Sequence, residues 1–516
     1  MSLLPNRVLS LCFALIVSIT VAVSASPPKW DLVIAEARVM DPESGLDAVR
    51  WVGIRNGRIE SISESPIEGG ETLDASGHVL APGFIDLHIH GQDPSSYDFL
   101  ARDGVTSALD LEAGVHNIDG FLARREGKSR VHYGASAGHI PARAFVLDGV
   151  SLEHLLTARK MESQWRLLWT GVQTWFQGEP RWGRDQASPP EQSAIRTALA
   201  RELDRGAIGI GMGLAYTPGA DKSEVQSVFD LAANYDVPIF VHLPIQLGPN
   251  DTKPLEVVID FARQSGAAIH VVHINSSSQD AVGEYFNLIE AGQAEGMDIS
   301  AEAYPYTAGS TLIETALFDE GWAERRGMDY GDLQWAATGE RLTAESFSRY
   351  REQGGTVILH FMKPENVATA VTHPLSIIAS DGMPMSDASP HPRGAGTRAR
   401  VLAEYVRERG DLDLMTALRK MSLGPAQRLE EFVPAMREKG RIRIGADADL
   451  VIFDPLRVQD LATFERPHQA SAGIPHVLVD GVFVVRDGIL VEGAAPGRPL
   501  RGLGASAPQS PGTQGN

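Results

Sequence analysis

The sequence is poor in cysteine and in positive charge. Its 516 residues include a single cysteine, Cys12, and its 46 lysines and arginines face 66 aspartates and glutamates, which gives a formal net charge of −20 at pH 7. One cysteine excludes a disulfide framework within the chain. An acidic surface repels nucleic-acid phosphates and anionic lipid headgroups. We therefore expect a small-molecule partner, with no nucleic acid and no stable membrane association.

The cysteine lies in an N-terminal segment that is typical of a secretory signal. Arg7 supplies the positive charge, an apolar run follows from Val8 to Val23, and Ser24 and Ala25 offer small residues for cleavage. Because the run is short for a membrane span, we expect a signal peptide at residues 1–25 and a periplasmic or secreted protein. The mature chain would then have no cysteine, so metal ligands would have to be His, Asp, Glu or a modified Lys.

Hydrophobic residues make up 43% of the chain and charged residues 22%, which is ordinary globular composition. Short strand-like segments in residues 29–82 and again in residues 431–493 are separated by turns such as Asn56-Gly57 and Asp480-Gly481. Two such segments flanking a long centre predict that they pair into one small β-sandwich domain. Glycine, proline, serine and alanine dominate residues 494–516, which predicts a disordered tail.

The centre, residues 83–430, alternates short apolar runs with helical patterns. This alternation predicts an α/β fold, a (β/α)₈ TIM barrel of parallel strands. A ninth run, Thr356–Met362, falls in an insertion of about residues 307–372, which we interpret as a candidate lid. The eight runs expected to form the barrel are Phe84–His90, Val105–Ala113, Val131–Gly138, Ile208–Gly213, Pro238–Leu243, Ala268–Ile274, Asp298–Tyr304 and Ser376–Asp381.

Residues that bind metals stand at the ends of five of these runs. The carboxyl ends of barrel strands carry the chemistry in this fold, and His88 and His90 are spaced to point to the same side. Four histidines and two carboxylates predict one or two divalent ions, with zinc as the best match. In chain order, the candidate ligands are His88, His90, Glu112, His242, His273 and Asp381.

Several motifs resemble the amidohydrolase superfamily, and within it the D-aminoacylase branch (N-acyl-D-amino-acid deacylases). The resemblance covers about residues 30–493. It implies a metal-dependent hydrolase acting on linear C–N amide bonds, which deacylates N-acyl-D-amino acids or cleaves peptides that contain D-residues. The motifs are Ala81–His90, Gly213–Gly219, Tyr304–Thr311, Ser380–Gly382, His391–Arg393 and Gly445–Pro455.

The chain departs from this branch at its bridging ligand. Members bridge their metals with a cysteine on the second strand, where this chain has Glu112, a carboxylate that can also bridge, with Asp110 as the alternative. Other superfamily members use a carboxylated lysine on the fourth strand, but Ile208–Gly213 contains no lysine. Asn275 replaces a lysine that the branch often carries, so the side chain preferred in the substrate stays open.

The resemblance and the ligands together imply a mechanism in which a metal-activated hydroxide attacks the amide carbonyl. Asp381 would take the proton of the water and pass it to the leaving amine. The two metal sites would share Glu112. The remaining ligands would be His88, His90 and Asp381 in the first site and His242 and His273 in the second.

Three further residues are predicted to contact the substrate. Arg393 would grip the α-carboxylate, because a guanidinium matches a carboxylate with two hydrogen bonds. Tyr306 and Tyr216 would donate hydrogen bonds to the oxyanion or to the carboxylate.

Two alternative functions remain. One is hydrolysis of cyclic amides, of the hydantoinase or dihydroorotase kind, which usually needs the missing lysine. The other is a non-catalytic, metal-dependent binding protein, which Asp381 argues against. Deamination is disfavoured, because Leu243–Gln246 lacks the glutamate expected after the histidine of the fifth strand.

Overall fold

The structure is a computed structural model, and it describes residues 29–150 and 180–504. The predicted signal peptide, residues 1–25, lies outside the described residues, as do residues 505–516 of the predicted tail. Within the described part of the chain, no helix combines the length and the apolar character needed to cross a membrane.

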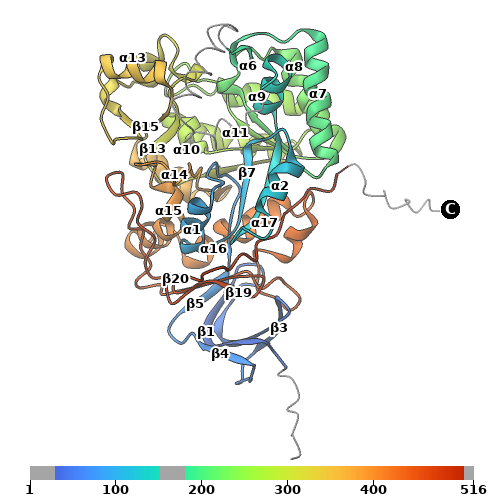
Figure 1. Cartoon of the computed structure of the whole chain (residues 1–516), viewed down its shortest axis with the longest axis vertical. Helices are drawn as coiled ribbons and strands as arrows, with labels where there is room; N and C mark the ends of the chain where they lie inside the picture. Colours follow the sequence, from blue (N-terminus) through green and yellow to red (C-terminus); the bar gives the residue numbers. More distant parts are fainter. Residues whose placement is uncertain (1–28, 151–179, 505–516) are drawn as a thin grey trace, which may run out of the picture.

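Eight parallel strands form the predicted barrel, which occupies the upper part of the molecule in Figure 1. Their order in the sheet follows the sequence, and each strand overlaps one of the eight apolar runs. Near-continuous apolar runs form such strands because both faces are covered. The strands are β6 (Phe84–Asp86), β7 (Val105–Val115), β8 (His132–Gly138), β9 (Ile210–Gly213), β10 (Ile239–His242), β11 (Ile269–Val271), β12 (Ile299–Ala303) and β16 (Ser376–Ile378).

The barrel closes at a seam between β6 and β16. Among the described strands these two share no regular ladder, and one isolated parallel bridge joins Ile89 to Gly382. The main-chain N–H groups of His90 and Gly91 both donate to the carbonyl of Gly382, at 2.7 and 2.9 Å. Side chains must therefore help to hold the two strand ends together.

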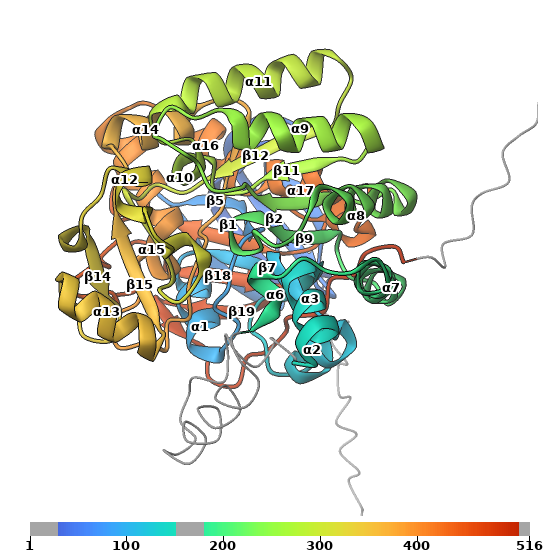
Figure 2. The same ribbon diagram turned by 90° about the horizontal axis from the view of Figure 1, so that it is seen from above.

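Helices surround the barrel in the predicted alternation (Figure 2). α15 continues into a π-helical turn, η5 (Val401–Glu408). The helices that accompany the barrel strands are α1 (Pro94–Arg102), α2 (Ile118–Arg125), α3 (His139–Asp148), α6 (Arg181–Arg184), α7 (Pro189–Asp204), α8 (Lys222–Tyr235), α9 (Lys253–Ser265), α10 (Ile274–Ser278), α11 (Val282–Ala294), α14 (Pro364–Thr372), α15 (Arg393–Arg400), α16 (Leu414–Met421) and α17 (Leu423–Leu429).

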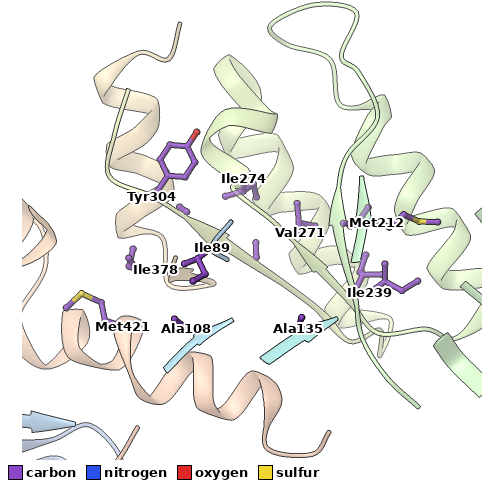
Figure 3. Close-up of a cluster of buried hydrophobic side chains, with 14 of the residues drawn as sticks. Ile89, Ala108, Ala135, Met212, Ile239, Val271, Ile274, Tyr304, Ile378 and Met421 are labelled. Carbon is purple, nitrogen blue, oxygen red and sulfur yellow. The ribbon is translucent and has the colours of Figure 1, made fainter. Parts of the chain in front are cut away.

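Helix α9 shows how the sequence specifies these elements. Pro254 stands in its first turn, and Gly266 ends it in the left-handed conformation, with φ 79°. Leu255, Val258 and Ala262 recur at helical spacing on its buried face. Such faces and the strands form the largest apolar cluster, part of which is drawn in Figure 3 with Ala108, Ala135, Met212, Ile239, Val271, Ile378 and Met421 labelled.

Strands from the two ends of the chain pair with one another in one mixed sheet, as the predicted fold requires. β5 and β17 run antiparallel, with Ala81 opposite Val451. Hydrogen bonds link the strands into one continuous mixed sheet of nine, which lies below the barrel in Figure 1. Its strands are β1 (Leu32–Asp41), β2 (Leu46–Arg55), β3 (Arg58–Ser63), β4 (Glu71–Asp74), β5 (Val79–Pro82), β17 (Leu450–Phe453), β18 (His476–Val479), β19 (Val482–Arg486) and β20 (Ile489–Leu490).

A separate three-stranded antiparallel sheet lies between β12 and β16 in the sequence, in the region of the expected insertion, and to one side of the barrel in Figure 2. It packs around an aromatic cluster that includes Trp322, Trp335 and Phe347. The strands of this sheet are β13 (Ala308–Leu312), β14 (Leu333–Trp335) and β15 (Thr356–His360). Between them in the sequence lie the helices α12 (Trp322–Arg326) and α13 (Ala344–Gln353).

The prediction of a disordered tail is wrong for residues 494–504. The N–H of Gly497 donates to the carbonyl of Ser129 at 2.9 Å, and the N–H of Leu500 donates to the carbonyl of Tyr133 at 2.7 Å. The side chain of Leu500 is buried. Glycine and proline do disfavour regular secondary structure here, but hydrogen bonds to the barrel satisfy this backbone instead.

Candidate metal centre

The six candidate ligands meet at the carboxyl ends of the barrel strands, around Glu112 of β7. Oε2 of Glu112 lies 2.9 Å from Nε2 of His88 and 2.9 Å from Nε2 of His90. Oε1 of Glu112 lies 2.7 Å from Nδ1 of His242 and 3.7 Å from Nε2 of His273. The two oxygens of one carboxylate therefore face two separate pairs of imidazoles.

Asp381 lies beside the first pair. Its Oδ1 is 3.5 Å from Nε2 of His88 and 3.5 Å from Nε2 of His90. With Glu112, these residues place one ligand atom each within 4.8 Å of one another, as do Glu112, His242 and His273. We call these sets the first and second ligand groups.

The backbone is unusual at two of the ligands. Asp381, just after β16, has φ 52°, and His273, just before α10, has φ 35°. Few residues with a side chain adopt positive φ, and such strained positions persist where the surrounding structure holds them. At both positions the strain accompanies a side chain that faces Glu112.

The arrangement of donor atoms fits divalent zinc. Nε2 of His88, Nε2 of His90 and Oε2 of Glu112 form a triangle with sides of 3.2, 2.9 and 2.9 Å. In the second group, Nε2 of His273 lies 3.0 Å from Nδ1 of His242. Lone pairs that converge in this way repel one another unless a proton or a cation lies between them. Imidazole nitrogens and carboxylate oxygens are ligands that zinc prefers, so these residues fit one ion in each group.

A buried carboxylate fixes the orientation of His88. Oε1 of Glu302, on β12, lies 2.6 Å from Nδ1 of His88, and Oε2 lies 3.0 Å from Nε2 of His270. Burial opposes ionisation of Glu302, but the two histidines outweigh it and lower its pKa to about 2. The carboxylate therefore accepts a hydrogen from Nδ1 and leaves Nε2 of His88 for a metal. Sequence analysis missed Glu302, whose only signal is an acid inside an apolar strand.

Asp110, the alternative bridge, lies in a different place. Its Oδ1 is 3.7 Å from Nδ1 of His90, the ring nitrogen that does not face Glu112. In the described part of the chain, Glu112 is the one residue that belongs to both ligand groups.

Carboxylates dominate the electrostatics of the first group. Burial opposes protonation of His88, but Asp381, Glu302 and Glu112 outweigh it and raise the pKa of His88 to about 10. Burial likewise opposes ionisation of Asp381, but Arg393 and His88 lower its pKa. The group is rich in buried negative charge, which is the electrostatic setting that a cation requires.

Arg393, which is predicted to contact the substrate, pairs with a carboxylate of the protein. Its Nη2 lies 2.9 Å from Oδ1 of Asp381, and its side chain is buried. Nε and Nη1 of Arg393 have no hydrogen-bond partner among the described residues. Arg393 is not among the residues that line the pocket, and its role at a substrate carboxylate stays a prediction.

The two predicted tyrosines differ in position. Tyr216 lines the pocket, with its hydroxyl 3.1 Å from Oγ1 of Thr311. Tyr306 is not among the lining residues. Its ring is buried against Arg400, whose guanidinium lies 4.8 Å from the ring centre. Tyr304, two residues earlier, lines the pocket instead. The backbone turns at Pro305, so only one of these two neighbours borders the ligands.

A pocket of about 530 Å³ extends from the ligands. Arg326, the last residue of α12, contributes a cation to its wall. Within the described residues no carboxylate pairs with Arg326, and its guanidinium lies 5.4 Å from the centre of the Phe361 ring. Nothing in the local sequence indicated Arg326. Other lining residues are Val115, Ile140, Pro141, Trp182, Leu317 and Leu359.

Comparison with known proteins gives consistent matches. Residues 287–485 match the amidohydrolase family. The N-acyl-D-glutamate deacylase of Alcaligenes xylosoxydans xylosoxydans is 31% identical over 476 residues, which cover 88% of this chain and 94% of that protein. The D-aminoacylase of the same organism is 27% identical over 506 residues, with the same coverage.

A solved structure shows the same fold. The N-acyl-D-glutamate deacylase of Bordetella bronchiseptica, in complex with zinc and a phosphonate inhibitor, is 24% identical, with a TM-score of 0.74. The match covers 92% of this chain and all of that one.

Proposed function

Because this chain belongs to the D-aminoacylase branch of the amidohydrolase superfamily, we propose that it removes the acyl group from N-acyl-D-amino acids or from D-residues of peptides. Its relatives and its ligand groups identify the chain as a metal-dependent amidohydrolase, and the particular substrate is the subject of the proposal. The observation that carries the proposal is the carboxylate of Glu112, whose two oxygens each face a pair of imidazoles. The names of its relatives support N-acyl-D-amino acids as substrates.

The residues would divide between two zinc ions, one for each ligand group. Bound zinc supplies a Lewis acid that polarises an amide carbonyl and makes water easier to deprotonate. The first group would hold one ion through His88, His90, Asp381 and Glu112, and the second group would hold another through His242, His273 and Glu112.

Asp381 handles the proton. Arg393 keeps this buried carboxylate ionised by lowering its pKa, so it can accept a proton. We assign Asp381 to take a proton from the attacking water and to deliver it to the nitrogen of the leaving amine. Arg393, 2.9 Å away, positions the carboxylate for both transfers.

Two arginines near the ligand groups favour a substrate whose amino-acid part is negatively charged. Arg326 presents a charge to the pocket without a carboxylate partner among the described residues. Arg393 pairs with Asp381 through Nη2 and keeps Nε and Nη1 without a partner among the described residues; it does not line the pocket, and we propose that it meets a substrate carboxylate from behind Asp381. Tyr216 adds a hydroxyl to the same wall. An acidic side chain, as in N-acyl-D-glutamate, gives each arginine one carboxylate to bind.

The test measures amine release by zinc-loaded protein from matched N-acetyl-D- and N-acetyl-L-amino acids, with glutamate, aspartate and leucine as side chains, and ring opening of hydantoin and dihydroorotate to their N-carbamoyl acids. We expect turnover of the D-series. Asp381→Asn should keep at least the zinc of the second group and lose activity by about a hundred- to ten-thousand-fold. Turnover of the cyclic amides alone would move the assignment to that class. No turnover of any amide by zinc-loaded protein would indicate a binding protein.

A further inference from the structure

Three candidate ligands stand at the seam where the barrel closes. His88 and His90 follow β6, and Asp381 follows β16. Among the described strands, β6 and β16 share no regular ladder, and the backbone bridge between Ile89 and Gly382 lies just beyond their ends. The distance between the two sides of the first ligand group therefore depends on contacts across this seam.

A buried carboxylate spans the seam next to these ligands. Oδ1 of Asp86, the last residue of β6, accepts from the main-chain N–H of His88 at 3.3 Å and from the main-chain N–H of Ser380 at 3.0 Å. His88 is itself a candidate ligand, and Ser380 immediately precedes Asp381. One oxygen atom thus holds the main chain on both sides of the first group.

Arg398 of α15 pairs with this carboxylate. Its Nη1 lies 3.1 Å from Oδ2 of Asp86, and its Nη2 donates to the carbonyls of Ile85 and Ile378 at 3.3 and 3.4 Å. Ile85 belongs to β6 and Ile378 to β16, so the guanidinium also contacts both strands. Asp86 and Arg398 are each 0% exposed. A fully buried ion pair gives little net stability compared with well-packed apolar residues, so its place at the seam favours a role in positioning.

Helix α15 is itself anchored. The carboxylate of Asp103 accepts from the main-chain N–H groups of Arg398 and Ala399, at 2.7 and 3.1 Å, and from the hydroxyl of Ser471 at 2.6 Å. The same helix begins at Arg393, which contacts Asp381. The helical backbone breaks at Gly396, so the hydrogen bonds of Asp103 anchor the part of α15 that carries Arg398.

We propose that the Asp86–Arg398 pair sets the spacing between His88 and Asp381, and through it the zinc affinity of the first ligand group alone. The second group comes from β7, β10 and the residues after β11, which are neighbouring parts of the continuous run of paired strands, although the pairing of β7 with β8 is irregular between Asp110 and Val115. The pair does not contact a ligand atom, so it is a positioning pair and not a catalytic one. The inference rests on the metal centre proposed above.

Two backgrounds separate the groups in the experiment. The variant H242A/H273A keeps only the first group, and H88A/H90A keeps only the second. Zinc affinity of metal-stripped protein is measured in each by competition with a chromogenic chelator. Asp86→Asn, which keeps the size of the side chain and removes its charge, should weaken zinc binding about ten- to a hundredfold in the first background. It should leave the second background unchanged.

Matched controls keep the proposal falsifiable. Glu224 and Arg143 form another buried ion pair, away from the seam, so Glu224→Gln should leave the affinity unchanged in both backgrounds. Thermal unfolding of the metal-free proteins checks that each variant folds, and Arg398→Lys replaces Asp86→Asn if the latter does not. Equal losses in both backgrounds, or none in the first, overturn the inference. Zinc binding in neither background, with Asp86 intact, overturns the metal centre instead.

Discussion

The guanidinium of Arg393 lies 2.9 Å from the carboxylate of Asp381, and both side chains are buried at the carboxyl end of the barrel. Burial alone would favour the neutral acid, but Arg393 and His88 outweigh it and lower the pKa of Asp381. Arg393, which is predicted to bind the substrate, thus lowers the pKa of a carboxyl group of the protein. In the proposed function, this contact joins the residue assigned to substrate binding and the residue assigned to proton transfer.

Arg393→Gln should shift the acid limb of the pH profile to higher pH. Removing the guanidinium raises the pKa of Asp381, because burial favours the neutral acid and one of the cations that oppose this effect is gone. A base with a raised pKa is protonated, and so inactive, up to a higher pH. The measurement is kcat/KM of zinc-loaded protein against pH. Arg393→Lys keeps the charge and should shift the acid limb less. If the acid limb of Arg393→Gln does not shift, Arg393 does not influence the residue that transfers the proton.

Glu112→Gln should disturb both metal sites. An amide offers one oxygen, so it cannot give an anionic oxygen to each ligand group. We expect the zinc content of the purified, zinc-loaded protein to fall by at least one ion relative to the unmodified chain. Asp110→Asn is the matched control on the same strand. Unchanged zinc content in Glu112→Gln, with loss in Asp110→Asn, would transfer the bridging role to Asp110.

Glu302→Gln should weaken zinc binding about ten- to a hundredfold, the usual cost of removing a partner behind a metal-binding histidine. The glutamine no longer fixes the hydrogen on Nδ1 of His88 as an ionised carboxylate does. His270→Gln removes the other partner of Glu302 and should cost less, because His88 keeps its carboxylate. Affinity by chelator competition distinguishes them, and equal losses would contradict the assigned orientation.

Arg326→Gln should affect acidic substrates more than neutral ones. A hydrogen bond to a charged group contributes about 1.5–3 kcal/mol, which corresponds to roughly a ten- to a hundredfold rise in KM for N-acetyl-D-glutamate. We expect kcat to change little, because this contact is the same in the ground state and the transition state. N-acetyl-D-leucine reports the background effect. A matching rise in KM for both substrates would exclude a specific ion pair.

The segment after residue 493 contributes to stability. Leu500 is 3% exposed, whereas Leu503 in the same segment is 49% exposed. Leu500→Ala should lower the free energy of unfolding by about 2–5 kcal/mol, as for other buried leucines. Leu503→Ala should lower it by less than about 1 kcal/mol. Urea denaturation followed by circular dichroism measures both. Equal effects would mean that the segment does not pack as described.

The sequence allowed the barrel to be predicted because its strands are buried on both faces, so each appears as a compact apolar run. The ligands could be predicted because strand ends converge, which makes His88 and Asp381 neighbours despite their separation in the chain. Contacts that depend on tertiary packing left no local pattern. Glu302 lies 214 residues from His88, and Arg326 stands on a short helix of the three-stranded insertion with no motif around it.

Anomalous diffraction from crystals of the zinc-loaded protein, with data collected at the zinc absorption edge, tests the central claim most directly. The account predicts anomalous density beside the carboxylate of Glu112, coordinated by imidazole nitrogens of His88 and His90, of His242 and His273, or of both pairs. Zinc bound elsewhere in the molecule, with no anomalous density next to Glu112, would contradict it.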